Sequence, residues 1–489
     1  MIFHSLDFVV FFLLTTAAYW RLPRRGQNAL LVVCSYVFYG WVHPWFLLLI
    51  GATTIADYAA ARGMEAWPRH RKTMLGLSLA VNLGLLGAFK YFGFFVDNAH
   101  TALALFGIEL PRGALSVLLP VGISFYTFQE LSYTIEVYRG TLRARRDFID
   151  FAAFVSFYPQ LVAGPIERAS HLLPQVEQRR VWSWPASREA LFLIAWGYFK
   201  KLVIADNVGL VANKVFSLDH PGFTVLWSGV FAFAVQIYAD FSAYSDIARG
   251  VARWLGFDLM LNFNHPYMAT GPIDFWRRWH ISLSSWFRDY VYVPLGGSRG
   301  GRWRTARNVF VTFIVSGFWH GASWNYILWG AYHGVLLLAA RAIASVTSRT
   351  EAGTAARRSG HTPGRRHISA IELLQVAGTF VLTCVGWLLF RETDLHALIR
   401  DLTLSPFDTT LADRQVGLYL FVLTLLYAWP LLVDGFWAVY VAPALREKNA
   451  TRPAIGAVVA VRTLLAGLAL AAIVVFRSQQ SLDFIYFQF

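Results

Sequence analysis

Two histidine-bearing segments in the middle of the chain carry the side chains best suited to chemistry. One reads Asp274-Phe-Trp-Arg-Arg-Trp-His280, and the other reads Ser316-Gly-Phe-Trp-His320-Gly-Ala-Ser-Trp324. His320 lies in a long apolar run, residues 309–338, where an ionisable side chain is expensive to bury and therefore indicates a functional site. A neutral imidazole in a dry site is a competent general base. The alternative is an imidazole that only hydrogen-bonds a neighbouring helix.

The residues around His320 favour acyl transfer. Hydroxyl and amide side chains that could orient a substrate are close in sequence, namely Ser316, Ser323, Asn325 and Tyr326. No Gly-x-Ser-x-Gly elbow supplies a serine nucleophile, and no His-Glu-x-x-His or Cys/His cluster indicates zinc. His320 and His333 do not share a helical face, so we expect no metal site. Acyl transfer to a hydroxyl fits, because it needs a base and a positioned acyl donor but no metal.

A second set of polar residues follows an earlier apolar segment. Gln236, Asp240 and Tyr244 recur at helical spacing and therefore line one face of a helix. Such a stripe must point into a helix bundle or a wet cavity rather than at lipid, which makes Gln236 and Asp240 candidate substrate-binding residues. The alternative is that these side chains form hydrogen bonds between helices.

The composition predicts an all-α polytopic membrane protein. The 489 residues are 56% hydrophobic and 15% charged, against about 25% charged in typical soluble proteins. Apolar segments that approach the roughly 20 residues needed to span a bilayer recur from end to end, at 7–20, 74–95, 223–241, 373–390, 416–432 and 454–476. We expect about eleven or twelve spans in a single integral domain, 1–489. Its parts are N-terminal spans in 1–137, a catalytic core in 138–342, a basic cytoplasmic loop in 343–368 and C-terminal spans in 369–489.

Basic residues lie mainly in the breaks between apolar segments. Arg21, Arg24 and Arg25 follow the first span, whereas the Val42–Pro44 turn carries no Lys or Arg. This alternation is the positive-inside pattern, which predicts a multi-pass protein with its N-terminus outside and the basic loops in the cytoplasm. The formal charge of +14 is therefore expected to face the anionic headgroups of the lipid bilayer rather than nucleic acid.

Two segments are expected to enter or line the membrane without crossing it. Residues 151–166 are broken by Pro and Gly and flanked by basic residues on both sides, which predicts a re-entrant or interfacial segment. Residues 249–307 carry nine Arg and no Lys, interleaved with Trp and Tyr, which predicts an interfacial helix in the headgroup plane. The run Gly296–Gly301 predicts a flexible turn, because no Lys-Ser/Thr follows to make a phosphate loop.

Several motifs, in order along the chain, resemble the membrane-bound O-acyltransferase family. They are Asn262-Phe-Asn264, Phe275-Trp-Arg-Arg-Trp-His280, Trp286-Phe-Arg-Asp-Tyr290, Pro294-Leu-Gly-Gly297 and Trp319-His320-Gly321. With the upstream Tyr158-Pro-Gln-Leu-Val-Ala-Gly164-Pro-Ile166, they are most similar to the bacterial branch that acetylates alginate and other exopolysaccharides. The resemblance runs from the N-terminus to at least Gly334, whereas the tail beyond about residue 400 carries little that is diagnostic.

The resemblance implies a ring of tilted helices around a thinned centre, with a tunnel that joins the two faces of the bacterial inner membrane. His320 would be the family's active-site histidine, and His280 the second histidine, reached from the cytoplasm. Acetyl-CoA or an acyl carrier would supply the acetyl group, and Arg277 and Arg278 would suit the phosphates of acetyl-CoA. The acceptor would be a sugar hydroxyl, reached directly or through a periplasmic esterase-like partner that works with the polysaccharide export machinery.

Other functions fit parts of the same sequence. Within the family, the alternatives are transfer of D-alanine toward teichoic acid and acetylation of peptidoglycan or cellulose, although the run Pro294-Leu-Gly-Gly-Ser-Arg299 resembles the polysaccharide acetylation branch more closely. A membrane transporter is an alternative of a different class, because the polar stripe and His320 could line a proton or solute path. Transporters often show two related halves, and this chain shows no internal repeat.

Overall fold

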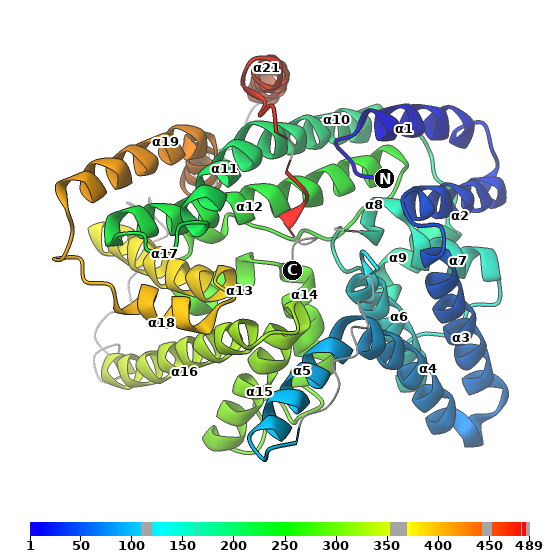
Figure 1. Ribbon diagram of the computed structural model, residues 1–489. Helices are drawn as coiled ribbons and strands as arrows, with labels where there is room; N and C mark the ends of the chain where they lie inside the picture. Colours follow the sequence, from blue (N-terminus) through cyan, green and yellow to red (C-terminus); the bar gives the residue numbers. More distant parts are fainter. Residues whose placement is uncertain (109–119, 163, 353–368, 443–451, 481, 486–489) are drawn as a thin grey trace. The chain divides into compact units, whose positions relative to one another are not determined.

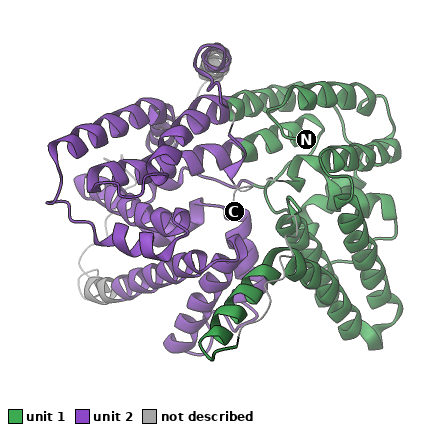
Figure 2. Cartoon of the chain, in the orientation of Figure 1, with its two compact units in different colours: residues 1–198, 244–260 green, residues 199–243, 261–489 purple. Residues whose placement is uncertain are grey.

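The computed structural model describes residues 1–108, 120–162, 164–352, 369–442, 452–480 and 482–485. Within these ranges the regular elements are helices (Figure 1), as the composition predicts. The chain divides into two compact units (Figure 2). Unit 1 comprises residues 1–198 and 244–260, and unit 2 comprises residues 199–243 and 261–489.

The first helix of unit 1 is capped at its N-terminus by Ser5, whose hydroxyl accepts a hydrogen bond from the Phe8 amide at 3.1 Å. The helices of this unit are α1 (Leu6–Tyr19), α2 (Arg24–Gly40), α3 (Phe46–Ala66), α4 (Arg71–Leu86), α5 (Phe92–Ala104), α6 (Ile123–Arg139), α7 (Phe148–Ser156), α8 (Tyr158–Leu161), α9 (Ala169–Glu177) and α10 (Trp184–Phe199). A π-helical segment, Gly87–Tyr91, joins α4 to α5. This unit also contains the end of α12, which is shared with unit 2.

Buried polar side chains hold three helices of unit 1 together. The Asp57 carboxylate on α3 accepts hydrogen bonds from Ser78 Oγ at 2.6 Å and Asn82 Nδ2 at 2.8 Å, both on α4. Thr54 Oγ1 donates to Glu130 Oε1 on α6 at 3.3 Å. Interhelical hydrogen bonds of this kind supplement van der Waals packing in membrane helix bundles.

The predicted re-entrant segment is broken into short helices. α7 has nine residues and α8 has four, with a break at Phe157. Helices of this length are far shorter than the roughly 20 residues that cross a bilayer. The segment is also buried in unit 1, where the Tyr158 amide donates to Ser35 Oγ on α2 at 3.1 Å. Both findings agree with a segment that enters the protein without crossing the membrane.

Unit 2 begins within a continuous helical stretch and contains the two histidine segments. Its helices are η3 (Lys200–Ala205, π-helical), α11 (Asp206–Phe216), α12 (Phe223–Trp254), η4 (Pro266–Met268), α13 (Pro272–Arg278), α14 (Ile281–Phe287), η5 (Arg288–Tyr292, π-helical), α15 (Arg302–His320), α16 (Trp324–Ala352), α17 (Ala370–Arg391), α18 (Leu395–Thr403), α19 (Leu411–Phe436), η7 (Trp437–Val441, π-helical) and α21 (Arg452–Phe476).

Five helices in the described part of the chain are long and apolar enough to cross a membrane. They are Pro68–Ala104, Phe223–Trp254, Trp324–Ser345, Ala370–Arg391 and Leu411–Val441. The total of eleven or twelve spans stays a prediction. Of the predicted basic loop at 343–368, the first part continues α16 to Ala352, and residues 353–368 lie outside the described residues.

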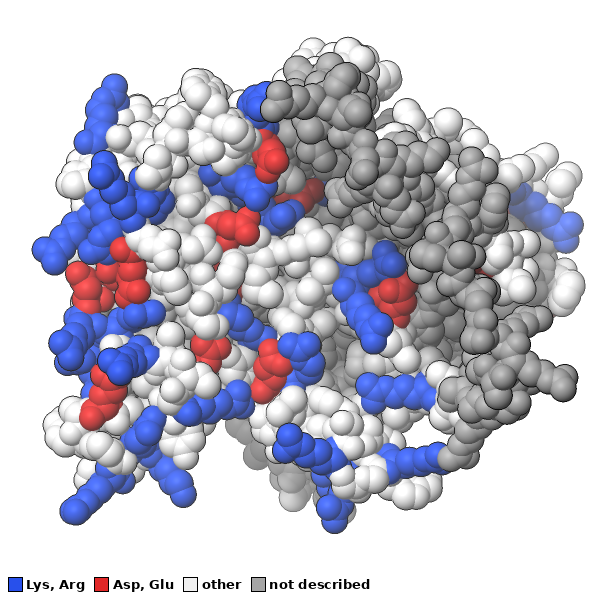
Figure 3. Space-filling view, turned by 180° about the vertical axis from the view of Figure 1, so that it is seen from behind, with Lys and Arg blue, Asp and Glu red and all other residues white. Residues whose placement is uncertain are grey.

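The Arg- and Trp-rich region is divided between short helices, and its place in the headgroup plane stays a prediction. It forms the short helices α13 and α14, which are separated by a break at Trp279 and His280. Trp279 and Phe287 are buried inside unit 2, whereas Arg277 and Arg288 are exposed. These two aromatic side chains therefore contribute to the interior of unit 2. Lys and Arg side chains gather, with fewer Asp and Glu, on the face of the molecule that Figure 3 shows.

α15 and α16 form a tight hairpin because glycines allow their backbones to approach closely. A Cβ atom added at Gly317 would lie 2.1 Å from the Tyr326 carbonyl oxygen, and one at Gly330 would lie 2.3 Å from the Phe313 carbonyl oxygen. Neither position can accept a larger side chain without separating the helices. The hairpin places His320 at its tip, as the last residue of α15.

Candidate active site

The His320 side chain is buried in a sheath of aromatic rings. Its ring centroid lies 4.9 Å from that of Trp319, 5.0 Å from that of Trp329 and 5.3 Å from that of Phe390. The three rings come from α15, α16 and α17 respectively. Side chains from three helices therefore restrict the orientation of this imidazole and exclude water from its surroundings.

Gly321 is required by the packing just after His320. A Cβ atom at this position would lie 2.1 Å from Cε2 of the Tyr326 ring. The Tyr326 ring in turn packs against Phe390, with centroids 4.9 Å apart. The glycine of the Trp-His-Gly motif thus lets an aromatic ring close over the hairpin tip beside the histidine.

Asn325 ties the beginning of α16 to the end of α17. Its Nδ2 donates to the carbonyl oxygens of Leu389 at 3.3 Å and Phe390 at 3.1 Å. Carbonyls in the last turn of a helix lack partners within that helix, so this amide satisfies them. The position of Asn325 close to His320 in the sequence makes it a candidate substrate-binding residue. In the structure, Asn325 holds the residue that packs against His320.

His280 occupies the break between α13 and α14 in a left-handed backbone conformation, with φ of 43°. Asn262 holds this break: its carbonyl oxygen accepts from the Ile281 amide, and its Oδ1 accepts from Ser282 Oγ, both at 2.9 Å. The ring centroid of His280 lies 4.7 Å from that of Phe241 on α12. Burial lowers the pKa of His280 to about 3, so this imidazole is neutral at physiological pH.

The structure brings the two predicted histidines to one indole ring. Trp319 lies 6.2 Å from His280 and 4.9 Å from His320, measured between ring centroids. A third histidine, His333, also packs against Trp329, with ring centroids 5.0 Å apart. Its spacing from His320 along the chain predicts no shared helical face. In the structure both imidazoles contact the Trp329 ring.

The predicted polar stripe on α12 contains a buried ion pair. Lys201 Nζ lies 3.0 Å from Asp240 Oδ1 and 2.9 Å from Asp206 Oδ1, and we call these three residues the ionic triad. The other carboxylate oxygen of Asp240 accepts from the Ile485 amide at 2.7 Å, and Lys201 also donates to the Leu482 carbonyl at 2.9 Å. Both oxygens of the Asp240 carboxylate therefore have partners, one in η3 and one in the segment 482–485.

Gln236 is buried one turn before Asp240 on α12, beside Gly209 of α11. A Cβ atom at Gly209 would lie 2.7 Å from Gln236 Nε2. Lys201 and Asp206 did not emerge from the sequence as partners of the stripe. The sequence did contain a signal for these partners. Lys200 and Lys201 lie inside an apolar stretch, and a cation that is buried there requires a carboxylate partner.

The two candidate arginines are placed differently on α13. Arg278 Nε lies 2.9 Å from Asp274 Oδ1, one helical turn away, and Arg278 Nη1 donates to the Asn264 carbonyl at 3.4 Å. Arg277 is exposed. Of the two, Arg277 presents its guanidinium to the surroundings, whereas Arg278 fastens the helix that leads to His280.

No group of three or more His, Cys, Asp or Glu side chains in the described ranges could hold a metal ion. The candidate active site contains two buried imidazoles, those of His280 and His320, and aromatic rings surround both. The His280 imidazole is neutral at physiological pH. A neutral imidazole can take a proton from a hydroxyl nucleophile and return it to a leaving group. A water-excluding enclosure protects a reactive acyl donor from hydrolysis.

Comparison with known proteins agrees with this chemistry. A sequence profile of the membrane-bound O-acyltransferase family matches residues 137–383. The chain is 40% identical over 406 residues to a probable alginate O-acetylase of Pseudomonas putida, which covers 82% of this chain and 79% of the relative. It is 32% identical over 418 residues to a peptidoglycan O-acetyltransferase of Helicobacter pylori, covering 78% and 75%. A teichoic acid D-alanyltransferase of Bacillus subtilis is 29% identical over 46% of this chain and 59% of its own length. The chain belongs to the membrane-bound O-acyltransferase family and is an O-acyltransferase.

Proposed function

We propose that this protein is a membrane O-acetyltransferase for an exported, alginate-like polysaccharide. The observation that carries the proposal is the 40% identity to a probable alginate O-acetylase over about four fifths of both chains. The geometry supports it, because His280 and His320, which lie in two separate motifs of the resemblance, flank one indole ring. The acetyl donor is acetyl-CoA from the cytoplasm, and the N-terminus lies outside the inner membrane.

In the proposed reaction, His320 accepts the proton of the nucleophilic hydroxyl while the hydroxyl oxygen attacks the thioester carbonyl carbon. The new C–O bond forms, the C–S bond breaks, and the proton passes from the imidazolium to the departing thiolate. The products are an acetate ester and the free thiol of coenzyme A. General base catalysis of this kind typically contributes about 10²–10⁴-fold in rate.

The remaining candidate residues support these steps in the proposal. His280 contacts the donor from the cytoplasmic side, and Arg277 and Arg278 attract its phosphates. Gln236 lines the acceptor path, Asp240 fixes α12 beside that path through the ionic triad, and Asn325 holds the hairpin that carries His320. The acetyl group crosses a central tunnel and reaches the polymer directly or through a periplasmic esterase-like acetyltransferase that works with the export machinery.

The test measures transfer of radiolabelled acetyl from acetyl-CoA by purified protein in liposomes, with and without the candidate periplasmic partner. The wild type is compared with His320→Ala and with His333→Ala, which removes another buried imidazole that packs against Trp329. We expect His320→Ala to lose at least about 100-fold, and His333→Ala to stay within tenfold of wild type. Circular dichroism and gel filtration establish that each variant is folded.

Transfer that survives in folded His320→Ala would remove His320 from the reaction. The acceptor is tested separately by supplying polymannuronate or peptidoglycan, because the Helicobacter pylori relative makes peptidoglycan a second candidate. Labelling of peptidoglycan alone would replace the alginate-like acceptor and leave the acetyltransferase assignment intact. Transfer of D-alanine from a charged carrier protein, without any acetyl transfer, would contradict the proposal.

A further inference from the structure

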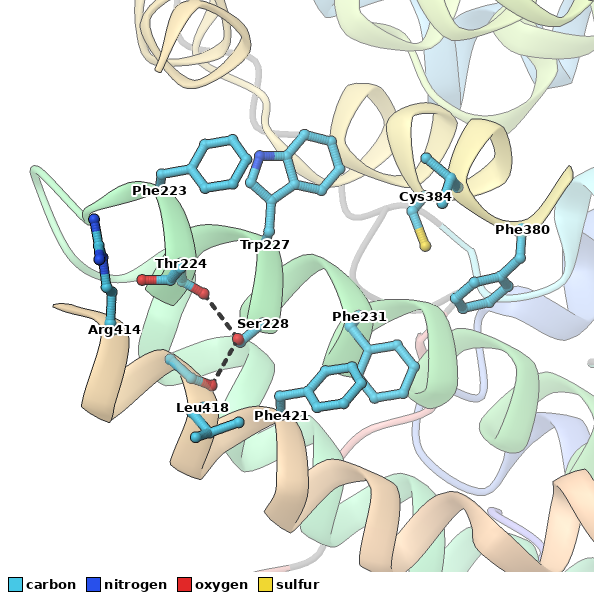
Figure 4. Close-up of a pocket in the computed structure, with 12 residues that line it drawn as sticks. Phe223, Thr224, Trp227, Ser228, Phe231, Phe380, Cys384, Arg414, Leu418 and Phe421 are labelled. Atoms are coloured by element: carbon cyan, nitrogen blue, oxygen red, sulfur yellow. Dashed lines mark hydrogen bonds between the residues drawn. The ribbon is translucent and has the colours of Figure 1, made fainter. Parts of the chain in front are cut away.

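An apolar pocket of about 430 Å³ lies in unit 2, on helices other than α13, α14 and α15, which carry the histidine motifs (Figure 4). Phe223, Trp227 and Phe231 of α12 form one wall, and Phe380 of α17 and Phe421 of α19 form the others. The volume falls in the range of about 300–1,000 Å³ that is typical of small-molecule sites.

The pocket is built by helices that suit a membrane. α12, α17 and α19 all contain segments long and apolar enough to cross a bilayer. The Ser228 hydroxyl lies 2.8 Å from the carbonyl oxygens of Thr224 and Gly417, which fastens α12 to α19 at the pocket (Figure 4). A chamber with aromatic walls between such helices is most readily filled by hydrocarbon, because the surrounding solvent is itself hydrocarbon.

A cation stands at the rim of this pocket. Arg414 lines the pocket from the first turn of α19, and its Nε donates to Thr409 Oγ1 at 2.6 Å. The adjacent carboxylate, Asp413, is used elsewhere: it accepts from the Thr224 amide at 3.1 Å and from the Thr224 hydroxyl, which caps α12. Within the described residues, no carboxylate comes within ion-pairing distance of the Arg414 guanidinium.

We propose that this pocket binds one acyl chain of an anionic glycerophospholipid whose phosphate pairs with Arg414. The aromatic chamber suits the chain, and a planar guanidinium suits the phosphate because it can donate two parallel hydrogen bonds. Anionic headgroups beside an exposed arginine also gain electrostatic attraction that a zwitterionic headgroup lacks. The proposal concerns lipid binding alone and does not depend on acetyl transfer.

The inner wall of the pocket connects by packing to the aromatic sheath of His320. Phe380 lies 5.0 Å from Tyr267, whose hydroxyl accepts a hydrogen bond from Trp387 Nε1 at 3.0 Å. Trp387 packs 5.8 Å from Phe390, the ring that covers His320. Three ring contacts and one hydrogen bond therefore connect Phe380 in the pocket wall to His320.

The experiment uses the full-length protein in detergent and native mass spectrometry, with phosphatidylglycerol and phosphatidylcholine of identical chains as probes. Val381→Trp fills the pocket, and Arg414→Gln removes the rim charge. Val433→Trp on α19 and Arg477→Gln after α21 are matched controls, because both residues are exposed and neither lines the pocket. We expect wild type to retain phosphatidylglycerol at least fivefold more tightly than phosphatidylcholine, Arg414→Gln to lose that preference, and Val381→Trp to lose both lipids.

Equal retention of the two lipids by wild type, or unchanged retention in Val381→Trp, would overturn the proposal. A second measurement does not depend on the variants folding: phosphatidylglycerol with a photoactivatable chain is crosslinked to the wild type. Labelling is expected to concentrate in residues 223–231 and 414–421. Labelling spread evenly over the exposed helix faces, or labelling abolished by a polyprenyl phosphate and not by phosphatidylglycerol, would also contradict it.

Discussion

Lys201 and His320 are both buried ionisable side chains of unit 2, but the fold surrounds them in opposite ways. Lys201 lies within 3.0 Å of the carboxylates of Asp206 and Asp240. His320 is enclosed by the rings of Trp319, Trp329 and Phe390. In the ionic triad one cation lies between two carboxylates, whereas aromatic rings from three helices pack around the imidazole of His320.

Under the proposed function, this difference separates a structural use of buried polarity from a chemical one. Buried charges are tolerated when their partners are in place, and removing one partner leaves an uncompensated charge that destabilises the fold. An aromatic sheath holds no charged partner whose loss would leave a buried charge uncompensated, so we expect removal of the His320 side chain to affect acetyl transfer more than stability. Four substitutions test this comparison, beginning with the largest expected effect.

Lys201→Met should break the ionic triad and destabilise the protein by about 3–5 kcal/mol, because two carboxylates lose their cation. Detergent-solubilised protein followed by thermal unfolding measures the effect. Lys214→Met is the control, since Lys214 is exposed on α11 and its loss should be close to neutral. Acetyl transfer per folded molecule should stay within tenfold of wild type. An unchanged melting temperature for Lys201→Met would refute the structural role of the triad.

Gly321→Ala tests the same comparison by disturbing the packing around His320 without removing a polar side chain. The added methyl group meets the Tyr326 ring, so we expect a loss of about 1–3 kcal/mol from overpacking together with reduced acetyl transfer. Adding Tyr326→Leu should recover part of the stability. Gly51→Ala is the control, because nothing lies within 4 Å of a Cβ atom there. Full activity in the single variant would contradict the need for close ring packing beside His320.

Trp387→Phe tests whether a hydrogen bond helps to fix the aromatic sheath. The substitution removes the Nε1–H that donates to the Tyr267 hydroxyl, and a net loss of about 1 kcal/mol is typical for such a bond. Chemical or thermal unfolding should show this loss, whereas Trp429→Phe at an exposed position of α19 should not. If both substitutions had the same effect, the hydrogen bond would not be the cause.

Arg278→Gln should have the smallest effect on stability. Its ion pair with Asp274 joins two partly exposed side chains one turn apart on α13, and such pairs contribute about 0–1 kcal/mol. The decisive measurement is the KM for acetyl-CoA in parallel with Arg277→Gln. A larger KM increase in Arg277→Gln would agree with the exposed guanidinium contacting the donor. A larger increase in Arg278→Gln would assign that contact to the paired residue.

Local sequence patterns predicted an all-helical fold and the break at residues 151–166, and they drew attention to the two histidine motifs, because each depends on residues that are close along the chain. The neighbours of His320 could not be predicted in the same way. Phe390 is supplied by α17, and Asn325 fastens it through contacts about 65 positions away. The ionic triad was missed for a similar reason, since no periodic pattern links Lys201 to Asp240. The resemblance supplied the proposed roles of His280 and His320, and the structure supplied the rings that surround them.

The contact between Asp240 and the tail has a consequence for the order of biosynthesis. The Ile485 amide that caps this carboxylate follows it by 245 residues. At roughly 5–20 residues per second, translation needs about 12–50 s to cover that distance. During this interval Lys201 and Asp206 are already synthesised, so Lys201 can pair with Asp240. The other oxygen of the Asp240 carboxylate lacks the Ile485 amide as its partner until residue 485 is made. The ionic triad therefore reaches its final set of partners only after nearly every membrane helix has been synthesised.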